Sequence, residues 1–195
     1  MEKIALDVVL FLSKEMTKIC IDINSLAVQR GETSIQLGTS DYFPHISLLM
    51  GVVQQKDTAE VVTTLENMEF PLSLSLKAFE VAEYPALRVQ KTPAIVQLHE
   101  EVISRVEKSF VSDVAQEDFF TEDKNDIDDE FMHHVQNYIS LHSYQNFDPH
   151  ITIHTTNIHP YSPPLNFSAS HLAVCQLGEK GTCRKILYAK KLETS

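Results

Sequence analysis

Pro44-His45-Ile46-Ser47 and Pro149-His150-Ile151-Thr152 share the pattern Pro-His-apolar-Ser/Thr, with their histidines 105 positions apart. Given nine histidines in 195 residues, the composition predicts roughly 0.02 full matches of this pattern by chance. Two matches in one chain are therefore a strong paired signal.

On β-strands, both motifs would present a histidine and a hydroxyl side by side. Residues i and i+2 project from the same face of a strand. His45 would therefore lie beside Ser47, and His150 beside Thr152, while the isoleucine between them turns toward a core. We expect the two strands to meet at a cleft that holds two imidazoles and two hydroxyls.

This set of side chains suits phosphodiester chemistry without a metal ion. One imidazole can take a proton from the attacking water or hydroxyl while the other protonates the leaving oxygen. Histidine fits both tasks because its ordinary pKa allows both protonation states near neutral pH. The two hydroxyls can bind the non-bridging oxygens of the phosphate.

Outward from the motifs, the chain alternates predicted strands and helices. The expected strands are Ala5–Ser13, Tyr42–Val53, Leu72–Leu76, Ala86–Gln90 and Asp148–Thr155. The expected helices are Lys14–Val28, Thr58–Asn67 and Pro93–Phe110, with a further helical face from Ile127 to His142. A terminal hairpin is predicted over His171–Leu192, turning at Gly178–Gly181.

The charge of the chain limits the partners that it can bind. Lys and Arg number 16 against 27 for Asp and Glu, so the formal net charge is −11. Proteins that grip long nucleic acid need a basic face, so no groove for long nucleic acid is expected. Nine acidic residues lie between Asp113 and Glu130, where we expect a solvated loop and helix start. Five glycines form neither GxGxxG nor GxxxxGK[ST], which excludes the common nucleotide-binding loops.

The cysteines and the hydropathy predict a cytoplasmic protein. Cys20, Cys175 and Cys183 are sparse and odd in number, so free thiols in a reducing cytosol are the favoured interpretation. The alternative is a disulfide between Cys175 and Cys183 across the terminal hairpin. No segment approaches the roughly 20 apolar residues of a membrane span, and no membrane partner is expected.

The two motifs make the chain resemble the 2H phosphoesterase superfamily, which is defined by two HxS/T motifs. It looks most similar to the bacterial 2′-5′ RNA ligase-like members. Three further stretches support the likeness: VVLF at 8–11, FPHISLLMG at 43–51 and AVCQLGEKGTCRKIL at 173–187. The resemblance covers nearly the whole chain. It therefore implies one domain over residues 1–195.

The resemblance implies an α+β, bilobal fold, with two similar halves of antiparallel sheet flanked by helices around a central cleft. It implies cyclic phosphodiesterase or RNA end-joining activity with no cofactor and no required metal. His45 and His150 become the catalytic pair, and Ser47 and Thr152 the phosphate-binding residues. One departure follows the second motif, where His154 and Thr155 replace an expected apolar residue and glycine.

Two further residues are candidates for substrate contact. His154 would share a face with His150 and Thr152 and so contact substrate or perturb His150; the alternative is a structural histidine at the strand end. Arg184 belongs to a local positive patch with Lys180 and Lys185. One of these could contact a phosphate, although solvated charges are the favoured interpretation.

The histidines of the acidic helix are expected at the surface. His133, His134 and His142 could suggest a metal site when taken with Asp128 and Asp129. Adjacent histidines, however, point to different sides of a helix, so the surface interpretation is favoured.

The predicted function is that of an enzyme acting on a 2′,3′-cyclic phosphate or a 2′-5′ linkage in a small nucleotide or RNA end. The alternative is a binding module that holds a nucleotide or RNA end in the same cleft with little turnover. The oligomeric state is not assigned.

Overall fold

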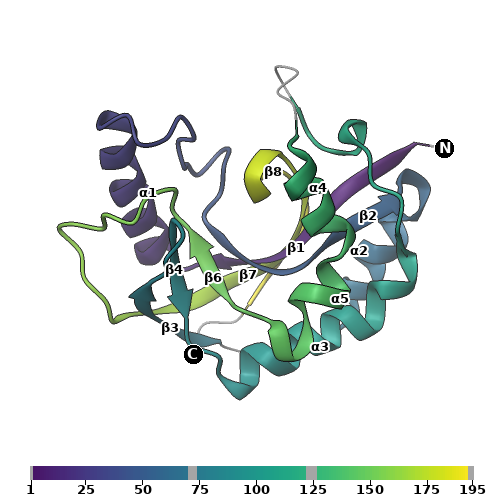
Figure 1. Cartoon of the computed structure of the whole chain (residues 1–195). Helices are drawn as coiled ribbons and strands as arrows, with labels where there is room; N and C mark the ends of the chain where they lie inside the picture. The colour runs from purple at the N-terminus through teal and green to yellow at the C-terminus, as the bar shows by residue number, and fades with distance from the viewer. Residues whose placement is uncertain (1, 70–73, 122–126, 193–195) are drawn as a thin grey trace.

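The computed structural model describes residues 2–69, 74–121 and 127–192, which form an α+β arrangement (Figure 1). The strands are β1 (Lys3–Leu12), β2 (His45–Gln54), β3 (Ser75–Val81), β4 (Ala86–Val89), β5 (Phe110–Val111), β6 (His150–Thr152), β7 (Leu165–Leu177) and β8 (Cys183–Lys191). The helices are α1 (Lys14–Gln29), α2 (Thr58–Glu66), α3 (Pro93–Val106), α4 (Asp129–Gln136) and α5 (Tyr138–His142). No helix of these residues is long and apolar enough to cross a membrane.

The eight strands join in one antiparallel sheet with the order β5-β2-β1-β7-β3-β4-β6, and β8 also pairs with β7. The two motif strands, β2 and β6, are therefore separated on this path by β1, β7, β3 and β4. They nevertheless contact each other in space. The sheet must curl to bring them together, and a cleft between the motifs is the result.

The long strand β7 connects the two parts of this sheet. Its residues 165–168 pair with β3, and residues from 169 onward pair with β1. From His171 onward it also pairs with β8 on its other side. The antiparallel α+β fold that the resemblance implied is thus confirmed.

Most predicted helices are confirmed, and two of them begin at N-cap residues of the expected type. Ser13 caps α1 by accepting the backbone N–H of Met16, and Thr92 caps α3 ahead of Pro93. The face expected from Ile127 to His142 is broken at Asn137 into α4 and α5. The predicted strand 72–76 begins outside the described residues; Leu74 precedes the strand, and β3 begins at Ser75.

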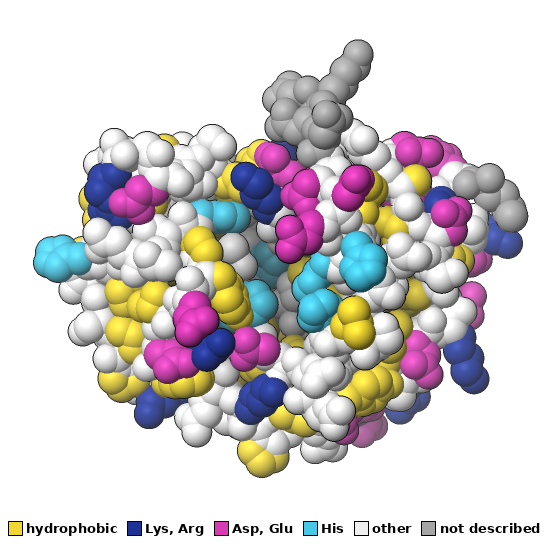
Figure 2. Space-filling model, viewed as in Figure 1, with side chains coloured by type: hydrophobic (Ala, Val, Ile, Leu, Met, Phe, Trp, Pro, Cys, Tyr) yellow, Lys and Arg dark blue, Asp and Glu magenta, His cyan; other side chains and the backbone are white. Residues whose placement is uncertain are grey.

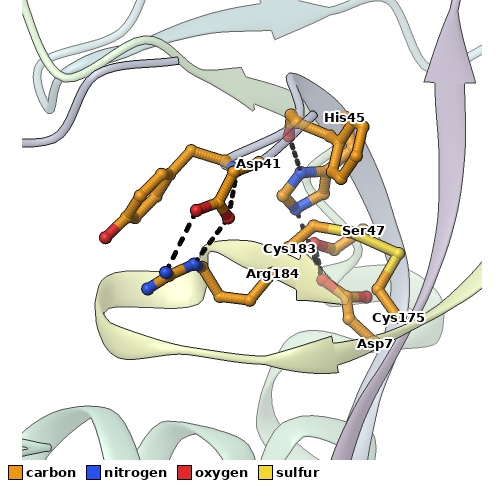
Figure 3. The surroundings of a disulfide bond; sticks show 9 residues. Asp7, Asp41, His45, Ser47, Cys175, Cys183 and Arg184 are labelled. Carbon is orange, nitrogen blue, oxygen red and sulfur yellow. Dashed lines mark hydrogen bonds and ion pairs between the residues drawn. A yellow bond between two sulfur atoms is a disulfide. The ribbon is translucent and has the colours of Figure 1, made fainter. Parts of the chain in front are cut away.

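The expectation of three free thiols is wrong, because Cys175 on β7 and Cys183 on β8 form a disulfide (Figure 3). Their Cα atoms are 5.6 Å apart, a separation that a disulfide can span. Two register shifts in the β7–β8 hairpin bring the cysteines into reach, and the sequence pattern contained no sign of these shifts. Cys20 is the buried free thiol.

Replacing both Cys175 and Cys183 by serine is expected to lower the free energy of unfolding by about 2–3 kcal/mol, since the bond closes a short loop. Chemical denaturation of the variant and the unreduced wild type would measure this difference. Thiol titration of the unreduced, unfolded wild type should find Cys20 alone. Three reactive thiols in that sample would contradict the disulfide.

Candidate active site

All four predicted motif residues line one pocket of about 390 Å³, a volume typical of small-molecule sites. β2 contributes His45 and Ser47, and β6 contributes His150 and Thr152. Figure 2 shows the surface hollowed here, with histidine side chains on both sides. The other lining residues are Met50, Tyr84, Phe131, His134, Tyr138, His142, Asn146, Asp148, Lys180 and Gly181.

The two motif histidines are held in the same way. His45 Nδ1 lies 2.6 Å from the carbonyl oxygen of Phe43, and His150 Nδ1 lies 2.7 Å from that of Asp148. Because a carbonyl oxygen can only accept a hydrogen bond, both Nδ1 atoms carry a proton. In each ring Nε2 is therefore the atom that can take up or release a proton.

A carboxylate lies beneath the first motif, where sequence reasoning placed only a buried strand. Asp7 on β1 is completely buried, and its Oδ2 accepts a hydrogen bond of 2.7 Å from Ser47 Oγ (Figure 3). The same oxygen lies 3.4 Å from His45 Nε2. Asp7 Oδ1 has no hydrogen-bond partner among the described residues. The signal that could have found it is a lone charged residue within an apolar strand.

The surroundings of the two histidines separate their pKa values. Burial lowers the pKa of His45, but the hydrogen bond and charge of Asp7, with the carbonyl of Phe43, outweigh burial and raise it overall. Burial lowers the pKa of His150, and the contacts with Asp148 do not offset this effect. His45 thus favours the protonated form and His150 the neutral form, the division that an acid and a base require.

The two hydroxyls of the motifs are not equivalent. Ser47 donates its only hydroxyl proton to Asp7. Thr152 lines the same pocket, and its hydroxyl makes no hydrogen bond to another described residue. The Thr152 hydroxyl can therefore donate a hydrogen bond to a phosphate oxygen. The Ser47 hydroxyl can only accept one from the substrate, unless Asp7 is protonated and no longer takes the Ser47 proton.

The structure does not bring His154 or Arg184 to the pocket lining. β6 ends at Thr152, and His154 has a left-handed backbone with φ of 58°, so the alternation that predicted a shared face does not reach it. The side chain of Arg184 is 5% exposed, and its Nε lies 2.8 Å from Asp41 Oδ1. Lys180, from the same predicted patch, does line the pocket.

Solved structures match the fold along nearly the whole chain, whereas no family model and no curated protein sequence matches. E. coli LigT complexed with ATP is 13% identical, with a TM-score of 0.57 over 99% of this chain and 100% of LigT. The chain has the fold of LigT. A structure described as a phosphoesterase is 13% identical with a TM-score of 0.56, over 99% of this chain and 100% of that one. TT0787 of Thermus thermophilus is 16% identical with a TM-score of 0.52, over 98% of this chain and 100% of that one.

LigT has also been crystallised with phosphate, with 3′-AMP and with NADP+, and these structures align with 100% of this chain. The TM-scores are 0.57, 0.54 and 0.53. The resemblance to 2H phosphoesterases found in the sequence is thereby confirmed at the level of the fold.

The surface position predicted for the histidines of the acidic helix is confirmed for His133, whereas His134 and His142 are half-buried at the pocket. In this LigT fold, His134 on α4 and His142 at the end of α5 both line the pocket, while the adjacent His133 is exposed. α4 and α5 both contact β2. The apolar periodicity from Ile127 was the sequence signal that these helices have a face packed against the rest of the protein. Within the described residues, no group of three or more His, Cys, Asp or Glu could hold a metal ion.

Proposed function

We propose that the chain is a metal-independent phosphoesterase, one domain over residues 1–195, acting on 2′,3′-cyclic phosphates or 2′-5′ linkages of small nucleotides or RNA ends. The observation that carries this proposal is the pairing of His45 and His150 in one pocket, each held through Nδ1 by a backbone carbonyl. LigT complexes with 3′-AMP and with phosphate support ligands of this class.

The acid and base are assigned from the surroundings of each ring. In hydrolysis, neutral His150 takes a proton from water through Nε2, and the water oxygen forms a bond to phosphorus. The bond from phosphorus to the ribose oxygen breaks in line, and protonated His45 donates its Nε2 proton to that leaving oxygen. In the ligation direction a ribose hydroxyl takes the place of water. Thr152 donates its hydroxyl hydrogen bond to a non-bridging oxygen, where charge develops.

The deciding experiment is hydrolysis of a panel of 2′,3′-cyclic mononucleotides in EDTA. Wild type should turn over at least one substrate, and His150→Ala should not. His133→Ala is a matched control, because His133 is exposed and lies outside the pocket lining. An intact protein that binds 3′-AMP tightly but hydrolyses no cyclic phosphate or 2′-5′ dinucleotide would contradict the enzyme and support the binding module.

Thr152→Ala is expected to cost more activity than Ser47→Ala. Loss of the Thr152 donor should lower kcat/KM by about 10- to 100-fold, equivalent to roughly 1.5–3 kcal/mol for a hydrogen bond to a charged group. Ser47 donates to Asp7, so its loss should have a several-fold effect. Steady-state kinetics of both variants on one cyclic nucleotide would measure the difference, and a larger loss for Ser47→Ala would contradict this assignment.

Small substrates are favoured by the charge of the protein. A net charge of −11 repels long RNA, so binding of a mononucleotide should depend only weakly on salt concentration. The cytoplasmic location stays a prediction. The buried disulfide counts against it, because disulfides are rare in reducing compartments.

A further inference from the structure

The Cys175–Cys183 disulfide lies beside the carboxylate that contacts His45. Cys175 on β7 is the register partner of Asp7 on β1. Register partners on adjacent strands carry their side chains on the same face of a sheet, so the disulfide lies on the face of Asp7, as Figure 3 shows. Both cysteines are completely buried, in a small apolar cluster apart from the main core. One end of the disulfide is therefore fixed next to the partner of the proposed acid.

The other end of the disulfide holds the backbone that enters the first motif. The carbonyl oxygen of Cys183 accepts a hydrogen bond of 3.3 Å from the backbone N–H of Phe43. The carbonyl oxygen of Phe43 in turn lies 2.6 Å from His45 Nδ1. The Phe43 side chain also packs against the cluster that contains both cysteines. A single residue, Phe43, thus connects Cys183 to the imidazole of His45.

Arg184, which follows Cys183, holds the same segment through its side chain (Figure 3). Its Nε and Nη2 donate hydrogen bonds of 2.8 and 3.2 Å to the carboxylate of Asp41. Its guanidinium carbon lies 3.9 Å from the centroid of the Tyr42 ring. Tyr42 has a left-handed backbone with φ of 51°, which a residue with a side chain adopts only where its surroundings hold it. The start of β8 therefore fixes the three residues that precede Pro44.

The ladder of hydrogen bonds between β7 and β8 is irregular where the disulfide lies. The pairing shifts register between Val174 and Cys175, and again between Gln176 and Leu177. Such shifts leave residues unpaired and disrupt the ladder locally. The covalent bond therefore connects the two strands at a point where backbone hydrogen bonds hold them weakly.

These contacts form a closed path around His45. Asp7 Oδ2 lies 3.4 Å from His45 Nε2, and Asp7 pairs with Cys175 across the sheet. The disulfide leads to Cys183, and Phe43 leads back to His45 Nδ1. Asp7 and the carbonyl of Phe43 are also the groups that raise the pKa of His45 against the effect of burial. Both groups that set the state of His45 thus depend on the place where β7 and β8 are joined.

We propose that the Cys175–Cys183 disulfide is a positioning group for His45, which it holds between Asp7 and the carbonyl of Phe43. This inference rests on the proposed phosphoesterase function and adds that full activity requires the oxidised chain. Breaking the bond takes two electrons and two protons, which dithiothreitol supplies as it becomes a cyclic disulfide, and leaves two thiols. The start of β8 is then free to move away from β7, and His45 loses its fixed place.

An NMR titration of the His45 imidazole tests the proposal without any turnover. Because both cysteines are buried, the reduced protein is prepared by unfolding in dithiothreitol and refolding with the reductant present. The pKa of His45 should be lower in this protein, and in the double variant Cys175→Ala/Cys183→Ala, than in the oxidised wild type. Val174→Ala is the matched control, because Val174 adjoins Cys175 but packs in the main core. It should lower the Tm and leave the pKa of His45 unchanged.

Turnover of a 2′,3′-cyclic nucleotide gives the second measurement. Reduction and the double variant should each lower kcat by about 10- to 100-fold with little change in KM, because a small misplacement of a catalytic group slows the chemical step. The alkaline limb of the kcat profile should move to lower pH, and Val174→Ala should retain the kcat of wild type. Arg184→Gln keeps the disulfide but loosens the segment before His45. It should therefore lower the pKa of His45, although loss of its positive charge alone would raise that pKa.

A pKa of His45 that is the same in the oxidised, reduced and double-variant proteins would overturn the proposal and leave the disulfide a role in stability alone. An equal fall in Val174→Ala would also overturn it, because any loosening of the hairpin would then suffice. Absence of turnover in every form would contradict the proposed phosphoesterase function. The titration would still decide whether the disulfide positions His45.

Discussion

His150→Ala is expected to reduce kcat on 2′,3′-cyclic nucleotides by about 10²–10⁴-fold, and His45→Ala by a similar factor, the usual contribution of a positioned acid or base. Each variant leaves the other imidazole in place, so a large loss in both shows that the two act together. Single-turnover kinetics would measure the chemical step directly. Circular dichroism and thermal unfolding should show that both variants remain folded.

The two losses should differ in how they respond to added imidazole. Imidazole in solution can replace a missing base, so His150→Ala should regain part of its activity. His45 is 10% exposed and lies against Asp7, so rescue of His45→Ala should be weaker. Retention of most activity by either variant would contradict the two-histidine mechanism.

Asp7→Asn is expected to lower turnover at neutral pH by about tenfold or more, because it removes a charge-assisted contact with the acid. His45 acts in its protonated form, so activity falls as pH rises through its pKa. Asp7 is what raises that pKa against burial. Without the carboxylate, the alkaline limb of the kcat/KM profile should therefore move to lower pH. The acidic limb, set by the lowered pKa of His150, should move less.

Protein stability provides the control for this variant. Burial raises the pKa of Asp7 itself, so its contribution to stability is present at low pH and is lost as pH rises through that pKa. Asparagine should therefore leave the Tm at pH 7–8 unchanged or higher while activity falls. A lower Tm with an unmoved pH profile would mean that Asp7 is only structural.

The motif residues could be predicted because strand alternation is local. A His-x-Ser pattern fixes which side chains share a face, and both β2 and β6 obey it at Ser47 and Thr152. Strand alternation does not extend to His154, because the strand has already ended there and the backbone of His154 is left-handed. The end of a short strand depends on tertiary pairing, here of β6 with β4, and that is not encoded in the local pattern.

Residues contributed from distant segments could not be assigned from the sequence. Asp7 meets Ser47 because β1 pairs with β2 in a register that shifts at Val8 and Val9. His134 lines the pocket on α4, which contacts β2. Both outcomes depend on pairing and packing between segments far apart in the chain, and the periodicity of one segment does not specify which segment it packs against.

Because β7 lies in the middle of the sheet, we expect the pocket to form only after the ribosome has synthesised the chain well beyond the second motif. β7 leaves the ribosome after both motifs, yet it lies between β1 and β3 in the sheet. A nascent chain that ends before Leu165 would carry both motifs without the strand that joins their halves. Such late, long-range pairings are slow to form. Truncated products should therefore be inactive even though they keep every residue of the pocket except Lys180 and Gly181.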